Sequence, residues 1–484
     1  MILSLIFSIL LLSIIFVAFI PFYNRGLILF VGLLSSSIVL ILSTILLITF
    51  NFNQYYFQYL TKYNLGLDFL NINLLLGLDG LSIFFFYLSS FLIFLCVLFI
   101  WKESGIKEYV LSLITINLLL LLVFSTLDLF FFYIFFEGLL IPMYLLIGTK
   151  GSRERKIRAV YLFFFYTLIG SFFMLLGLLY IYSVVGSLNF EYLLCYSFSF
   201  DQQYWLWLAF FFSFASKVPL FPFHIWLPEA HVEAPTIGSV LLAGILLKLG
   251  VYGFLRFNLS LFPEASLYFS PLIYTLSLFG VVYASLTAIR QMDLKRVIAY
   301  SSVAHMNLIV LGIFSFNIIG IEGSIVQSIS HGFVSGAMFL LVGVLYDRYH
   351  SRFLYYYGGL THMTPLYASI FLIFTFSNIA LPGTSSFVGE FLLLCGIYQF
   401  NIISCFFACT SVILCGAYSL WVYNRIAFGN LKTSNTIVFK DLDLKEFTIL
   451  FPLILLVFLM GIYPKFFINY LTLSSTDIYS IYLF

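Results

Sequence analysis

The stretch FASKVPLFPFHIWLPEAHVEAPT, residues 214–236, places a lysine and two prolines directly behind an apolar run. That run, YWLWLAFFF at 204–212, has the composition of a membrane-spanning helix. A proline inside a helix interrupts its hydrogen bonding, and in a membrane the freed backbone groups must be buried in protein or face water. The stretch therefore predicts a broken membrane helix with an ionisable side chain, Lys217, at the break.

The whole chain has the composition of a membrane protein. Of its 484 residues, 63% are hydrophobic and 9% are charged, and the mean hydropathy is +1.10. A soluble domain carries about 25% charged residues. The sequence therefore predicts an all-α polytopic membrane protein, residues 1–484 forming a single membrane domain. Its six cysteines form no CxxC pair, and no glycine-rich nucleotide motif occurs, so no cofactor site is expected in this chain.

Apolar runs long enough for a membrane helix, about 20 residues, recur along the chain. We count fourteen, at residues 2–22, 27–50, 78–100, 108–126, 127–148, 157–184, 204–222, 235–256, 269–289, 294–315, 320–345, 366–400, 404–426 and 447–470. The run 366–400 is too long for one straight span, and LPGTSS at 381–386 interrupts it.

The distribution of basic residues supports this count and predicts an orientation. Most of the 22 Lys and Arg residues fall in loops that join odd-numbered to even-numbered spans. Only Lys62, Arg256 and Lys465 fall on the opposite side, and Lys217 and Lys248 lie inside spans. By the positive-inside rule, both termini are expected on the non-cytoplasmic or intermembrane side.

The seventh and twelfth spans are both broken by proline, and they lie five spans apart. Because their orientations are then opposite, we expect two inverted five-helix repeats with discontinuous helices 7 and 12. The repeats are predicted at 108–256 (spans 4–8) and 269–426 (spans 9–13). Three spans at 1–107 precede them, and the span 447–470 follows. Ordinary proline kinks are the simpler alternative.

Four ionisable side chains are expected well inside spans: Glu137, Lys217, Lys248 and Glu390. Each costs on the order of 3 kcal/mol at mid-bilayer unless it is paired, hydrated or neutralised. Desolvation favours the neutral form of a lysine, and a nearby carboxylate favours the charged form. A Glu137–Lys217 pair is therefore interpreted as a switchable proton site. Snorkelling and a structural ion pair are the alternatives.

Two histidines, His305 and His331, are also expected inside spans, with serines nearby. Their ordinary titration range suits proton relay, although a packing role explains a buried histidine equally well. His224, Glu229, His231 and Glu233 form another cluster. A metal site is conceivable there, but the absence of a tight ligand spacing argues against it. Interfacial anchors or the mouth of a proton path fit that cluster better. Asp79 and Asp128 are expected to cap helices, and the cysteines to be packing residues.

Several of these stretches resemble the antiporter-like membrane subunits of proton-pumping NADH:quinone oxidoreductase, respiratory complex I. The resemblance covers nearly the whole chain and is carried by FFYIFFEGLLIPMYLLIG (131–148), residues 214–253, IAYSSVAHMNLIVLG (298–312) and NIALPGTSSFVGEF (378–391). Within the family, the chain resembles the subunit-4 branch most. In that branch the charged residue of span 12 is a glutamate, which here is Glu390. Ser377 and Glu229 are conservative departures from the pattern.

The resemblance implies roles for the matching residues. Glu137 and Lys217 are implied as a gating pair, Lys248 as the central relay and Glu390 as the terminal exchange residue. His305 and His331 are implied as connecting groups. Such a chain would translocate protons as a subunit of NADH:ubiquinone reductase (H+-translocating), while flavin mononucleotide, iron–sulfur clusters, NADH and ubiquinone are bound by other subunits.

The same resemblance implies partners and a location. Other membrane subunits, with the antiporter-like subunits 2 and 5 as neighbours, accessory subunits and lipids such as cardiolipin are expected, and nucleic acid is not. The 61 Phe residues and the apolar N-terminus without a presequence favour an organelle-encoded protein of the mitochondrial inner membrane. The alternatives are a subunit of a multisubunit sodium/proton antiporter without redox coupling, and a passive structural spacer.

Overall fold

The structure, a computed structural model, describes residues 2–63, 73–102, 105–151, 154–430 and 440–482. Among these residues, twelve helices are long and apolar enough to cross a membrane. The two other predicted spans correspond to α9 (Phe200–Lys217) and to the pair α19 (Pro365–Asn378) and α20 (Ser385–Phe400). The prediction of a polytopic all-α membrane protein is confirmed.

The chain folds into two compact units. The first comprises Met1–Lys217, Lys248–Ser270 and Asn469–Phe484, and the second Val218–Leu247 and Pro271–Ile468. The elements that lie wholly or mainly in the first unit are α1 (Ile2–Phe19), α2 (Arg25–Thr49), β1 (Gln58–Tyr63), β2 (Leu74–Leu78), α3 (Ser82–Phe99), η2 (Ile100–Lys102), α4 (Ile106–Ser125), α5 (Leu129–Gly138), α6 (Leu140–Lys150), α7 (Lys156–Val185), α8 (Phe190–Leu194), α9, α12 (Leu247–Gly253), η4 (Phe254–Asn258), α13 (Leu259–Leu261), α14 (Pro263–Tyr268) and α23 (Pro464–Ser480).

The second unit holds the remaining elements. They are α10 (Trp226–Glu233), α11 (Thr236–Leu241), η3 (Leu242–Leu246), α15 (Ser270–Arg290), α16 (Leu294–Ile313), α17 (Ile318–Tyr349), η5 (Leu354–Tyr356), α18 (Leu360–Met363), α19, α20, α21 (Ile402–Ala427) and α22 (Leu444–Ile462).

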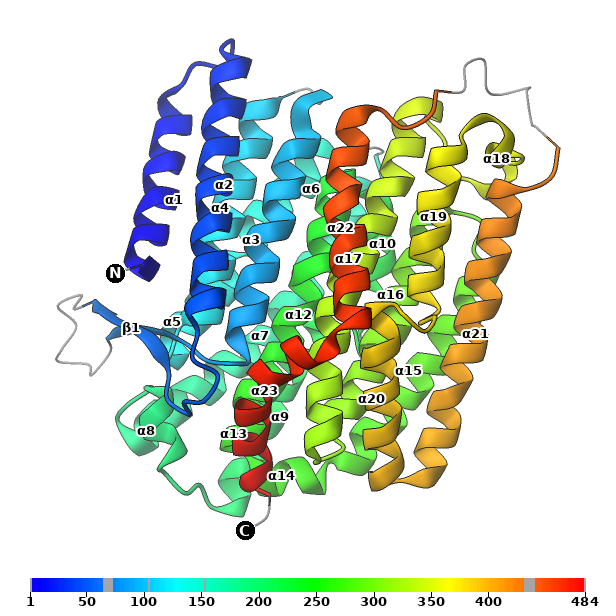
Figure 1. Cartoon of the computed structure of the whole chain (residues 1–484). Helices are drawn as coiled ribbons and strands as arrows, with labels where there is room; N and C mark the ends of the chain where they lie inside the picture. Colours follow the sequence, from blue (N-terminus) through cyan, green and yellow to red (C-terminus); the bar gives the residue numbers. More distant parts are fainter. Residues whose placement is uncertain (1, 64–72, 103–104, 152–153, 431–439, 483–484) are drawn as a thin grey trace. The chain divides into compact units, whose positions relative to one another are not determined.

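In the first unit, α1–α4 lie side by side (Figure 1). α1 packs against α2 and α4, and α3 packs against α2 and α4. Between α2 and α3, β1 and β2 pair as an antiparallel hairpin with Lys62 opposite Leu75. The sequence analysis did not predict this hairpin, because its strands are only 6 and 5 residues long and do not alternate clearly between apolar and polar residues.

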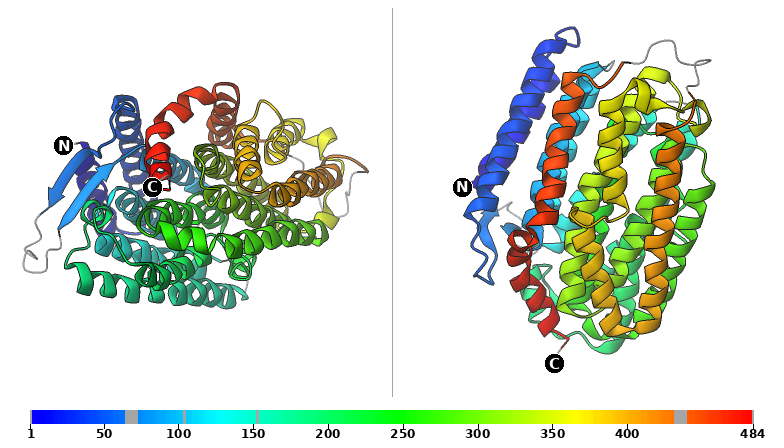
Figure 2. Two further views of the ribbon diagram at one scale, coloured as in Figure 1. Left: turned by 90° about the horizontal axis from the view of Figure 1, so that it is seen from below. Right: turned by 45° about the vertical axis from the view of Figure 1, so that its right-hand side comes forward.

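Helix α17 is the centre of the second unit (Figure 2). It packs against α16, α19, α20 and α22, and every residue from Gly320 to Leu345 is buried. Small residues make this close packing possible. A Cβ on Gly323 would lie 2.7 Å from the backbone nitrogen of Leu393, so α17 and α20 approach with their backbones nearly in contact.

Both predicted breaks are confirmed. Helix α9 ends at Lys217 and α10 begins at Trp226, so the lysine is the last residue before the interruption. Helix α19 ends at Asn378, and α20 begins at Ser385. A third irregularity was not predicted: the helix Thr236–Leu261 contains two π-helical segments, η3 and η4.

The end of the last span differs from its prediction at 447–470. Helix α22 stops at Ile462 and α23 starts at Pro464, since the residue before a proline disfavours helical dihedrals. Tyr463 accordingly has φ −124° and ψ 64°. The chain therefore has a further helix after its fourteenth span.

Arg256 also differs from its expected place. It was counted at the very end of the eighth span (235–256), on the side opposite the positive loops, whereas it lies inside the longer helix, in η4, and is buried. Its Nη2 donates to Asp79 Oδ1 at 2.6 Å. Burial alone would raise the pKa of Asp79, but Arg256 and Ser82 hold it below its ordinary value. Asp79 therefore both accepts the Ser82 N–H at the start of α3, as expected, and neutralises a buried cation.

Candidate functional site

In the first unit, Glu137 and Lys217 lie close together at two helix ends. Glu137 is the last residue but one of α5, and Lys217 ends α9. Lys217 is 3% exposed, and its Nζ lies 4.6 Å from the centroid of the Phe136 ring. Ser171 of α7 hydrogen-bonds to the Glu137 carboxylate, and Lys217 acts on that carboxylate electrostatically. The side chains of Glu137 and Lys217 are therefore neighbours, as predicted.

The two side chains nevertheless do not make a direct ion pair. Within the described part of the chain, no N–O distance of 4.0 Å or less joins Lys217 to Glu137. Oε1 of Glu137 is buried without a hydrogen-bond partner. An unpartnered buried carboxylate oxygen carries a large desolvation cost, so this oxygen is a place for a proton or a water.

Lys248 is fully buried in α12, between the two π-helical segments η3 and η4. A π-helical turn carries one extra residue, which changes the direction of the side chains that follow. The irregular helix thus determines which way Lys248 faces. The sequence analysis found the lysine and missed the π-helical segments, because the apolar pattern around Lys248 gives no signal for them.

In the second unit, Glu390 and His305 form a direct buried pair. His305 Nδ1 lies 3.0 Å from Glu390 Oε1, and both side chains are at most 7% exposed. Gln327 of α17 donates to the same Oε1 at 3.2 Å. Three helices, α16, α17 and α20, therefore converge on one carboxylate. The sequence located both residues in spans but gave no sign that they touch.

His331 lies beside this pair. Its ring centroid is 5.7 Å from that of His305, and the Ser335 hydroxyl donates to its carbonyl at 2.6 Å. Ser330 immediately precedes His331 in α17, and its hydroxyl lies 2.7 Å from that of Ser385. The structure thus brings the two predicted relay histidines together with the predicted exchange residue Glu390.

Cys415 of α21 was expected to be a packing residue and is instead hydrogen-bonded to this cluster. Its sulfur lies 3.7 Å from His305 Nε2 and 2.9 Å from the Tyr418 hydroxyl. The surrounding sequence, SVILCGAYSL at 411–420, looks like any apolar span, so nothing in it could have pointed to this contact.

The predicted cluster does not form one site, because its members have different partners. These members are His224, Glu229, His231 and Glu233. His231 stacks on Phe339 with centroids 4.6 Å apart, and Glu229 pairs with Arg296 at 2.9 Å. Three of the four, His224, His231 and Glu233, are buried inside the protein. The described residues contain no group of three or more His, Cys, Asp or Glu that could hold a metal ion.

A second buried charge cluster lies near Glu233 and was not predicted. Arg352 is 1% exposed, donates to the carbonyl of Val232 and lies 4.0 Å from Glu233 and 3.9 Å from Asp293. Lys295 donates to the Ala234 carbonyl at 2.8 Å. These cations tie the end of α10 to the start of α16, so they stabilise the part of the chain that follows the first break.

Each unit thus contains acid and base groups beside a helix break, of which Lys217, Glu390 and His305 are buried and Glu137 is half-buried. Such groups can hold a proton, release it and accept another, which inert packing residues cannot do. The arrangement suits controlled proton transfer through a membrane.

Comparison with known proteins gives the same class. Residues 126–414 match the family described as NADH:quinone oxidoreductase/Mrp antiporter, TM. NADH-ubiquinone oxidoreductase chain 4 of Chondrus crispus is 50% identical over 445 residues, which are 92% of this chain and 90% of that protein. The same chain of Arabidopsis thaliana is 51% identical over 462 residues, 95% of this chain and 93% of that one.

Solved structures agree. A chain of respiratory complex I from Thermus thermophilus with bound NADH is 31% identical, with a TM-score of 0.89 over 98% of this chain and 99% of that one. A chain of the Mrp complex from Dietzia sp. is 20% identical, with a TM-score of 0.86 over 99% and 98%, which shows a shared fold. The chain belongs to the NADH:quinone oxidoreductase/Mrp antiporter membrane family, in its NADH-ubiquinone oxidoreductase chain 4 group.

Proposed function

We propose that this chain is a core membrane-arm subunit of H+-translocating NADH:ubiquinone oxidoreductase. The observation that carries the proposal is an acid–base group beside each helix break, with Lys217 buried at the first and Glu390 and His305 buried at the second. The chain that contains these groups is about half identical to chain 4 proteins. Glu137 and Lys217 act as the gating pair, Lys248 as the central relay and Glu390 as the exchange residue. His305 and His331 connect them.

In this mechanism, electron transfer in other subunits changes the charge state of buried groups in the membrane. Separating Glu137 from Lys217 removes the carboxylate that stabilises the ammonium, so the lysine releases its proton towards Lys248 and Glu390. The breaks at 218–225 and 379–384 allow access to alternate between the two sides. Spans 4–8 and 9–13 are the inverted repeats that supply these breaks, because each contains one broken helix beside an ionisable residue.

The redox groups belong to other subunits: flavin mononucleotide, the iron–sulfur clusters, and the sites for NADH and ubiquinone. The neighbours are the antiporter-like subunits 2 and 5, together with accessory subunits. The protein lies in the mitochondrial inner membrane with both termini on the intermembrane-space side, as the loop charges favour.

Purification of the intact complex tests this function. We expect the chain to co-purify with flavin-bearing and cluster-bearing proteins, and its vesicles to acidify only when NADH and quinone are supplied. Sodium-dependent pH changes that persist without NADH, in a complex free of flavin, would instead establish the antiporter alternative. That alternative is disfavoured by the lower identity to the Mrp chain, 20% against 50% for a chain 4 protein.

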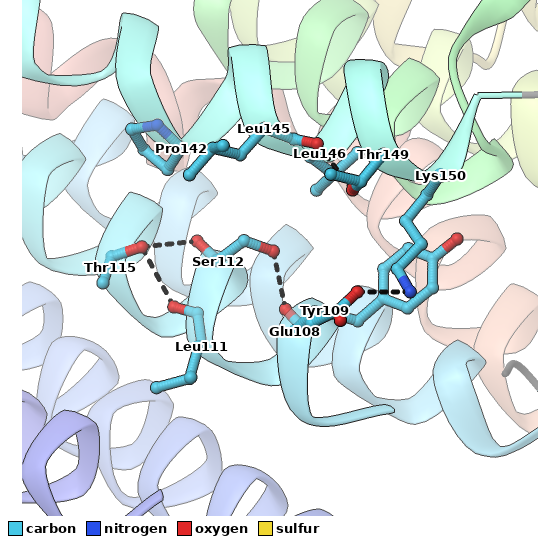
Figure 3. Close-up of a pocket in the computed structure, with 10 residues that line it drawn as sticks. All are labelled: Glu108, Tyr109, Leu111, Ser112, Thr115, Pro142, Leu145, Leu146, Thr149 and Lys150. Atoms are coloured by element: carbon cyan, nitrogen blue, oxygen red, sulfur yellow. Dashed lines mark hydrogen bonds and ion pairs between the residues drawn. The ribbon is translucent and has the colours of Figure 1, made fainter. Parts of the chain in front are cut away.

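We also propose cardiolipin as a bound lipid, in a groove of about 420 Å³ between α4 and α6 (Figure 3). Lys150 and Glu108, which pair with each other, both line this groove (Figure 3). Lys156, at the start of α7, donates to the carbonyl of the lining residue Thr149 at 3.2 Å. The hydroxyls of Ser112, Thr115 and Thr149 donate back to their own helices, so the wall is effectively apolar. An apolar groove beneath two lysines suits an acyl chain below an anionic headgroup.

Replacing both lysines tests the lipid. Each lysine near an anionic lipid contributes about 1 kcal/mol, so Lys150→Gln with Lys156→Gln should release a cardiolipin from the purified complex. Native mass spectrometry of the complex measures the loss. The exposed Lys445→Gln is the control and should change nothing. Unchanged cardiolipin in the double variant, or a zwitterionic lipid held in its place in the wild type, would refute this occupant.

A further inference from the structure

Cys415 occupies a position that the proposed relay does not use. It lies in α21, is 3% exposed, and its sulfur contacts groups from three helices. The thiol donates to the backbone carbonyl of Asn378 at 3.1 Å, and the Tyr418 hydroxyl donates to the sulfur at 2.9 Å. Nε2 of His305 lies 3.7 Å from the same sulfur.

The directions of these hydrogen bonds determine where protons sit on His305. A carbonyl oxygen can only accept, so the single thiol hydrogen points to Asn378. Towards His305 the sulfur can then act only as an acceptor, and Nε2 must carry a hydrogen. In the neutral imidazole the other nitrogen, Nδ1, is consequently bare. That bare nitrogen faces Glu390 at 3.0 Å.

The carbonyl that orients the thiol is itself a product of the helix break. Asn378 is the last residue of α19, immediately before the interruption at 379–384. The last carbonyls of a helix have no intrahelical partner, so they are free to accept from side chains. The discontinuity in α19–α20, the thiol and the titratable pair therefore form one connected set of hydrogen bonds.

We propose that Cys415 is a positioning residue of the proton relay, which sets the tautomer of His305 so that Nδ1 is the nitrogen that exchanges a proton with Glu390. The exchanged proton moves between Oε1 of Glu390 and Nδ1 of His305, one O–H bond breaking as one N–H bond forms, while the Nε2 hydrogen stays on the ring. A shift of Asn378 at the helix break would release the thiol and change this preference. The inference rests on the proposed function.

Substitutions at Cys415 separate this role from packing. Serine keeps a hydroxyl that can donate to Asn378 and accept from His305, whereas valine has a similar volume and no hydrogen bonds. If Cys415 positions His305, Cys415→Val should lower redox-driven proton transfer through this subunit by about tenfold, the lower end of the loss that follows removal of a hydrogen-bond partner of a metal-ligating histidine. Cys415→Ser should retain most pumping. A packing role predicts the reverse order, because a buried hydroxyl costs more than a methyl group.

Cys405, in the same helix, supplies the matched control. It is buried, and its thiol donates to the Leu394 carbonyl at 3.5 Å. Cys405→Val and Cys405→Ser should both pump normally. The pH profile of pumping gives a second readout: it should move in Cys415→Val and not in Cys415→Ser. Equal behaviour of the two Cys415 variants overturns the inference, whereas absence of redox-driven pumping in the wild-type complex overturns the proposed function itself.

Discussion

In Glu137→Gln, we expect proton transfer through this subunit to fall by roughly tenfold or more while the complex still assembles. Glutamine keeps the shape of the side chain and its hydrogen bond with Ser171, but it cannot carry the negative charge that acts on Lys217. Without that charge the buried Lys217 has no counter-charge to hold its proton, and loss of a positioned acid–base group costs about 10²–10⁴ in rate.

The measurement compares acidification of sealed vesicles with the rate of quinone reduction in the same preparation. Glu191→Gln is the control, since Glu191 lies exposed in α8 and its backbone N–H donates to the Asn189 side chain. Assembly is checked by the amount of intact complex. Normal stoichiometry and normal coupled turnover in Glu137→Gln would remove this residue from the relay.

The sequence was informative wherever a property belongs to one segment alone. Length and hydropathy of a single helix do not depend on its neighbours, so the spans were predicted well. Proline chemistry is equally local, which is why the breaks after Lys217 and after Asn378 were found. Charged residues in apolar runs stand out for the same reason, and Lys248 and Glu390 are both buried as expected.

The contacts between helices could not be predicted in this way. Glu390 and His305 are 85 residues apart, and whether they face each other depends on how α16 and α20 rotate against α17. Arg256 was misplaced because a buried cation needs a partner, here Asp79, that lies far away in sequence. Cys415 was overlooked because its role depends on the geometry of its neighbours.

The π-helical segments around Lys248 are a different case. They require no unusual residue, since the helix Thr236–Leu261 is apolar and buried throughout its most apolar part. Each π-helical turn holds an extra residue, which changes the direction of the side chains that follow it. The position of Lys248 along its span therefore did not determine which way its side chain points, and a proton relay depends on that orientation.

Because Glu390 and His305 are in direct contact, we expect substitutions of this pair in the second unit to have the second large effect on proton pumping. Glu390→Gln and His305→Gln should each reduce pumping by roughly tenfold or more, because each removes one end of a buried proton exchange. The double variant should be no worse than either single one. Groups that act as one unit are lost together, so their effects do not add.

A pair outside the relay provides the contrast. Arg296 and Glu229 are 2.9 Å apart and partly exposed, so Arg296→Gln should have a small effect that adds to that of Glu390→Gln. Pumping and quinone reduction are measured in all five variants at one pH. Multiplicative losses in Glu390→Gln/His305→Gln would mean that the two residues work independently. The 3.0 Å contact would then be a structural ion pair, and the proton would have to leave Glu390 by another group.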